Sequence, residues 1–203
     1  MTGFRKTGIV DQMVALARQS LEDPRGAARS LLALGVPLPA RTAGLLLMAV
    51  SSALLMHFGF LLMPATDDPM ALFMMESPLR TAFIQWLVLL ASVYLVYRVG
   101  RAAGGTGSLA DALLIVVWLQ VIMLAVQLVQ LVALIIVPPL AGIVNLAGLG
   151  LFFWLITSFI AVLHGFASRW MVLAGIVATS FALAIVLVVI LSAIYGPEAL
   201  QGV

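Results

Sequence analysis

Five long apolar stretches constrain this chain more than any other feature. They cover residues 43–63, 79–97, 112–137, 146–165 and 171–195. The hydrocarbon core of a bilayer is about 30 Å thick, and about 20 apolar residues in a helix cross it. Within that core every backbone polar group needs a hydrogen bond, which a helix supplies inside a single segment. The sequence therefore predicts an all-α, polytopic membrane protein with five transmembrane helices.

The composition excludes several classes of protein. Apolar residues make up 64% of the chain and charged residues only 9%, against about 45–50% and about 25% in soluble domains. The chain has no cysteine and only two histidines, so we expect neither a metal site nor a bound cofactor. Its net charge of +2 does not indicate nucleic-acid binding. The motifs Gly-x-Ser-x-Gly and His-Glu-x-x-His are absent, and we expect no enzymatic activity.

The basic residues fall on one side of the five predicted spans. The other side carries Arg80 alone. The remaining basic residues are Arg5, Lys6, Arg18, Arg25, Arg29, Arg41, Arg98, Arg101 and Arg169. Because loops rich in Lys and Arg stay in the cytoplasm, this distribution predicts a cytoplasmic N-terminus and a short external tail at 198–203. The hydrophilic start of the chain also predicts a retained first span rather than a cleaved signal peptide.

Residues 1–41 predict a short amphipathic helical arm before a transmembrane domain at 42–197. In the segment 8–22, apolar and polar residues separate onto two sides at helical spacing. A second helix begins at Asp23-Pro24 and ends at Gly35. The arm either lies on the inner leaflet, attracted by anionic headgroups, or packs on the cytoplasmic ends of the spans. The sequence leaves both arrangements open.

Local signals mark several helix starts. Asp23-Pro24, Asp68-Pro69 and Ser77-Pro78 each place a capping side chain before a proline, which suits the first helical position. Ser108 and Asp111 have the spacing of a capping box at the start of the third span.

Polar side chains inside a bilayer need partners, so each one is a candidate contact site. The candidates here are Gln120, Gln127 and Gln130 in the third span and His57 in the first. The ordinary interpretation is hydrogen bonding between helices. The alternative is a polar path along the third span.

A second candidate site lies in the two short loops on the cytoplasmic side. Its residues are Arg98, Arg101, Asp111, His164 and Arg169, which could contact a phosphate headgroup or a partner protein. Topology alone would also place arginines there. The segment Gly104–Gly107 lacks the Gly-Lys-Ser/Thr ending of a phosphate-binding loop, so we interpret it as a flexible turn. Ala174, Ala178 and Ala182 form a face of small residues for packing within the bundle or in an oligomer.

Three motifs suggest a family. They are Leu21-Glu22-Asp23-Pro24 in the arm, the glycine-rich run at 104–107 leading into Asp111-Ala112-Leu113, and Leu163-His164-Gly165 before a basic turn. In this order they resemble the bacterial branch of the Yip family, five-span proteins first known as partners of Rab GTPases. The resemblance implies an inner-membrane protein with a cytoplasmic N-terminus and a periplasmic C-terminus. The family's cytoplasmic Asp-Leu-Tyr-Gly-Pro motif is missing from this arm, so a Rab-type GTPase is not expected as a partner.

Two functions follow as hypotheses. The first is a non-enzymatic inner-membrane scaffold or accessory subunit that organises partner membrane proteins or lipids. Its expected partners are membrane lipids and either a membrane protein or further copies of the chain. The second is a small solute or lipid carrier that uses the polar stripe of the third span.

Overall fold

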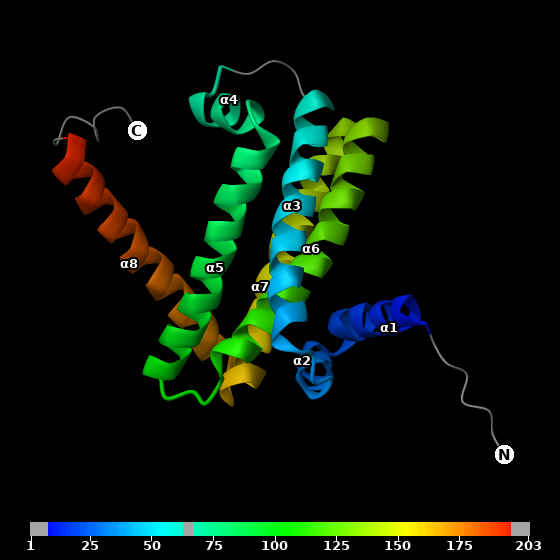
Figure 1. Ribbon diagram of the computed structural model, residues 1–203, viewed down its shortest axis with the longest axis vertical. Helices are drawn as coiled ribbons and strands as arrows, with labels where there is room; N and C mark the ends of the chain where they lie inside the picture. Colours follow the sequence, from blue (N-terminus) through cyan, green and yellow to red (C-terminus); the bar gives the residue numbers. More distant parts are fainter. Residues whose placement is uncertain (1–7, 63–66, 196–203) are drawn as a thin grey trace.

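A computed structural model describes residues 8–62 and 67–195 (Figure 1). In this part of the chain the helices are α1 (Ile9–Glu22), α2 (Pro24–Ala33), α3 (Leu38–Leu62), α4 (Pro69–Met75), α5 (Pro78–Ala102), α6 (Leu109–Ile136), α7 (Pro138–His164) and α8 (Arg169–Tyr195). The helices α3, α5, α6, α7 and α8 are long and apolar enough to cross a membrane. The predicted all-α, five-helix architecture is therefore confirmed. Arg5, Lys6 and the predicted tail at 198–203 lie outside the described residues.

The long helices alternate in direction (Figure 1). We call the end of the bundle where α1 and α2 lie the arm end. The α5–α6 connection at 103–108 and the α7–α8 turn at 165–168 lie at this same end, whereas α4 lies at the opposite, far end.

The predicted caps form as expected. The Asp23 carboxylate accepts from the Gly26 N–H at the start of α2, and the Asp68 carboxylate accepts from the N–H groups of Met70 and Ala71 at the start of α4. The hydroxyls of Ser77 and Ser108 cap α5 and α6 in the same way. The helix α7 begins at Pro138, well before the predicted span at 146, and only Val137 separates it from α6. Proline is common at the first helical position, because an N–H group there would have no hydrogen-bond partner within the helix.

The helix α6 lies at the centre of the bundle and packs against α3, α5 and α7. Ile115 on α6, Leu45 on α3 and Phe159 on α7 are almost completely buried in the shared core. At Gly148 a Cβ atom would lie 2.8 Å from the Val126 side chain, so this glycine allows α7 to approach α6 closely.

The helix α8 leaves the bundle. It packs on α7 near the arm end, where Val172 is buried, and then leans away from α5 (Figure 1). Its small-residue face, Ala174, Ala178 and Ala182, is exposed. In the described structure that face is therefore not used for packing within the bundle.

The arm packs on the arm end of the bundle, which is one of the two predicted arrangements. Ala27 and Ala28 on α2 are completely buried. The Trp118 Nε1–H donates to the buried Ser20 hydroxyl at 3.0 Å, tying α1 to α6. On α1, Ile9 and Val10 are 78% and 72% exposed. The inner-leaflet contact therefore stays a prediction for this exposed apolar side of α1.

Candidate functional site

His164, the last residue of α7, is enclosed at the arm end. It is 2% exposed, and its Nδ1 accepts from the Gly107 N–H at 3.3 Å. Its Nε2 lies 3.1 Å from the Val96 carbonyl oxygen. Because a carbonyl can only accept, Nε2 carries the proton and Nδ1 is the acceptor, as in a neutral imidazole. The Phe166 ring stacks on this imidazole with centroids 5.6 Å apart.

Three glycines surround the same ring. A Cβ atom at Gly100 or Gly105 would overlap the His164 side chain, and one at Gly107 would lie 2.9 Å from its Cε1. Backbone hydrogen bonds also hold the loop, since the Thr106 N–H donates to the His164 carbonyl at 3.2 Å. The segment 104–107 turns at Gly104, as predicted, and the sequence did not show that this loop packs around the imidazole. We call Gly100, Gly105, Gly107, His164 and Phe166 the glycine–histidine cluster.

Asp111 belongs to a separate ion pair. Its carboxylate lies 3.0 Å from the Arg41 guanidinium, whose side chain is only 10% exposed. Arg41 Nε also donates to the Val36 carbonyl at 2.7 Å, and a terminal nitrogen donates to the Ala110 carbonyl. The Ser108 hydroxyl donates to the other carboxylate oxygen at 2.6 Å. Asp111 thus connects the start of α3 to the start of α6, a role that sequence reasoning missed because it counted Arg41 only as a charge.

The five predicted residues of the arm end are therefore divided among different surroundings. His164 lies in the glycine–histidine cluster and Asp111 pairs with Arg41. Arg98 is exposed with its guanidinium 5.9 Å from the Tyr94 ring, and Arg101 is exposed and donates to the Gly105 carbonyl at 3.4 Å. Arg169 is exposed at the start of α8.

The predicted intramembrane polar residues are half-buried. Gln120, Gln127 and Gln130 lie along α6, and within the described residues the Gln127 Oε1 is buried without a hydrogen-bond partner. His57 Nδ1 lies 3.2 Å from the Ala53 carbonyl one turn earlier. Its Nε2 is buried and has no partner in the part of the chain that the structure describes.

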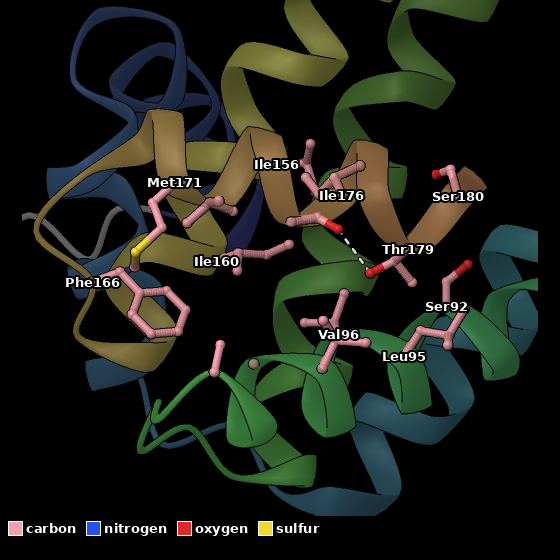
Figure 2. Close-up of a pocket in the computed structure, with 15 residues that line it drawn as sticks. Ser92, Leu95, Val96, Ile156, Ile160, Phe166, Met171, Ile176, Thr179 and Ser180 are labelled. Atoms are coloured by element: carbon pink, nitrogen blue, oxygen red, sulfur yellow. Dashed lines mark hydrogen bonds between the residues drawn. The ribbon is translucent and has the colours of Figure 1, made fainter. Parts of the chain in front are cut away.

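An apolar groove of about 220 Å³ opens between α5, α7 and α8 (Figure 2). Its lining is Ser92, Leu95, Val96, Val99, Gly100, Ala103, Ile156, Ile160, Phe166, Met171, Val172, Gly175, Ile176, Thr179 and Ser180. We call it the α5–α8 groove. The Thr179 hydroxyl donates to the Gly175 carbonyl at 2.7 Å, and the Ser92 hydroxyl donates to Val88. These hydroxyl protons are therefore satisfied within their own helices, and the groove presents a mainly apolar wall.

These features define a polytopic helical membrane protein whose N-terminal arm is folded onto one end of a five-helix bundle. The chain belongs to the Yip1 domain family, whose sequence profile matches residues 18–191. That match begins within α1 and includes all five long helices up to the last turns of α8. The chain matches no curated protein. It also matches no solved structure.

Proposed function

We propose that this protein is a non-enzymatic membrane scaffold or accessory subunit that receives a transmembrane helix of a partner protein in the α5–α8 groove. One observation carries the proposal: α8 is attached to the bundle near the arm end and leaves an apolar groove beside α5. From Ser92 on α5 to Ala103, which follows the last residue of that helix, the wall runs for about 16 Å at 1.5 Å per residue. This length corresponds to about three helical turns.

The lining supports a helix as the occupant. Transmembrane helices associate through close packing, which small residues at the contact allow. Ala103 and Gly175 line the groove together with the short side chains of Ser92 and Ser180. A partner helix could therefore bring its backbone close to α5 and α8 at the same time.

Filling the groove is expected to displace the partner. A Cβ at Gly175 would meet open space, so Gly175→Leu should fold normally and occupy the groove. We expect a photoreactive residue at Ile176 to cross-link a discrete partner protein in native membranes. Gly175→Leu should reduce the yield by about fivefold or more, because an overpacking cost of about 1–3 kcal/mol corresponds to a factor of about 5 to 160 in affinity.

The matched control is Gly150→Leu on α7, where a Cβ also meets open space but which does not line the groove. It should leave the cross-linking yield unchanged. Adducts with lipid only, or equal yields from the two variants, would count against a helix in the groove.

The proposed setting is a bacterial inner membrane, with the arm end in the cytoplasm and the C-terminus in the periplasm. The charge distribution supports this orientation. Described arginines at the arm end are Arg18, Arg25, Arg29, Arg41, Arg98, Arg101 and Arg169, and Arg80 lies at the far end.

Because the chain has no cysteine, single substitutions report the orientation cleanly. In intact cells, an impermeant maleimide should label Asp67→Cys at the far end, whereas Ser168→Cys should react only after permeabilisation. Both positions are exposed. The reverse pattern would invert the proposed topology.

A solute or lipid carrier is the second candidate, and the buried, unpartnered Gln127 Oε1 among the described residues favours it. None of Gln120, Gln127 and Gln130 lines the α5–α8 groove. A carrier would show flux in proteoliposomes that falls in Gln127→Leu, and a scaffold would show none.

A further inference from the structure

Two adjoining hollows lie on another side of the arm end, between the arm, α7 and α8. The larger, about 410 Å³, is mainly lined by charged and polar residues, including Arg25, Ser158 and Arg169. The smaller, about 270 Å³, is mainly lined by apolar and aromatic residues, including Trp170 and Leu173. Trp154 and Arg169 line both hollows. They therefore adjoin as one site with a polar and an apolar half, which we call the arm pocket.

Four charged residues line the arm pocket, and its two carboxylates already have partners within the arm. Glu22 lines it, and its carboxylate is paired with Arg18 at 2.8 Å. Asp23 lines it too, and its carboxylate caps α2 through the Gly26 N–H at 2.9 Å. Arg169 makes no hydrogen bond or ion pair within the described residues.

Arg25 is already held in position. Its terminal nitrogen donates to the Ala167 carbonyl at 3.0 Å, which fixes the guanidinium beside the α7–α8 turn. A guanidinium has five N–H donors, so this single bond leaves most of them for an anion. Arg25 and Arg169 therefore supply the unused donors of the polar half of the arm pocket, where an anion can accept hydrogen bonds.

The depth of the arm pocket matches the boundary between headgroups and hydrocarbon. Ser158 and Trp154 lie six and ten residues before the end of α7, or about 9 and 15 Å at 1.5 Å per residue. Trp170 is 71% exposed and Trp154 is 37% exposed. Tryptophan prefers this interfacial level. The apolar half therefore faces acyl chains, while the arginines lie nearer the aqueous side.

We propose that the arm pocket binds an anionic phospholipid. Its phosphate lies between Arg25 and Arg169, and an acyl chain follows Trp154 and Leu173 along α7 and α8. A water-soluble acidic peptide would leave the apolar half unfilled. The lipid would join the arm to the α7–α8 turn. The arm pocket shares no lining residue with the α5–α8 groove, and this proposal does not depend on the groove being occupied.

The test is lipid competition for the purified full-length protein in mild detergent, read by native mass spectrometry. With equal phosphatidylglycerol and phosphatidylcholine, we expect the anionic lipid to be favoured. Each arginine should contribute about a fivefold preference, the usual size for one basic residue near an anionic surface. Arg169→Gln should therefore lower the preference about fivefold, and Arg25→Gln with Arg169→Gln about 25-fold.

The matched control is Arg29→Gln, an exposed arginine of α2 that does not line the arm pocket. It removes the same charge and should leave the preference unchanged. If Arg25→Gln prevents folding, the single variant Arg169→Gln decides. An equal loss in Arg29→Gln, no preference in the wild type, or displacement of the lipid by millimolar inorganic phosphate would overturn the proposal.

The lipid proposal and the partner-helix proposal can be tested independently of each other. Gly175→Leu should keep the lipid preference, and Arg169→Gln should keep cross-linking from Ile176.

Discussion

Replacing Gly100 by alanine is expected to lower the free energy of unfolding by about 2–3 kcal/mol. The added Cβ would overlap the His164 imidazole, and overpacking costs about 1–3 kcal/mol. Displacing the ring also weakens its hydrogen bonds to Gly107 and Val96, at about 1 kcal/mol each. The better helix propensity of alanine offsets about 0.5–1 kcal/mol of this cost. In detergent the unfolding midpoint should fall by about 4–12 °C.

Two companion variants separate this clash from a general effect of alanine. Gly150→Ala, whose Cβ meets open space, should leave the midpoint nearly unchanged or raise it slightly. Combining Gly100→Ala with His164→Ala should cost less than the sum of the single changes, because the clash disappears with the ring. The described packing would be contradicted if the free-energy changes of Gly100→Ala and His164→Ala were strictly additive. It would also be contradicted if Gly100→Ala and Gly150→Ala had the same unfolding midpoint.

Arg41→Met is expected to cost about 2–3 kcal/mol of unfolding free energy. The substitution keeps most of the aliphatic stem but removes the donors to Asp111, Val36 and Ala110. Leaving buried acceptors without their donor costs about 1–3 kcal/mol. The Asp111 carboxylate, left without its cation, adds to this cost. Because the Asp111 side chain is 38% exposed, water compensates part of the loss.

Asp111→Asn is the comparison for Arg41→Met. It should cost only about 1 kcal/mol, since Arg41 keeps its two carbonyl acceptors. A double-mutant cycle read by thermal unfolding should show coupling between the two positions. If Asp111→Asn proved the more damaging change, the carbonyl contacts of Arg41 would have little energetic weight.

The five-helix architecture could be predicted because it depends on the length of each apolar stretch, a property of single segments. The caps at Asp23, Asp68, Ser77 and Ser108 could be predicted for the same reason, since the capping side chain and the N–H that it receives lie within one turn. The start of α7 was predicted less well. The pair Pro138-Pro139 both ends α6 and begins α7, and only its ending role was taken into account.

The arm-end contacts could not be predicted, because they join segments far apart in the chain. His164 meets Gly107 and Val96 across three different helices or loops, and no local periodicity specifies such a meeting. A glycine-rich run alone does not show whether its glycines serve a turn or make space for a neighbouring ring. Arg41 illustrates the same limit, since its partner Asp111 lies 70 residues away.

The attachment of α8 has a consequence for how the protein responds to its membrane. The other long helices pack along one another, whereas α8 is anchored near the arm end and most of its described side chains are exposed. A helix adapts to a thinner bilayer by tilting further. Because few contacts resist that tilt in α8, its inclination should follow bilayer thickness before the central helices move. The width of the α5–α8 groove would then change with the thickness of the surrounding lipid.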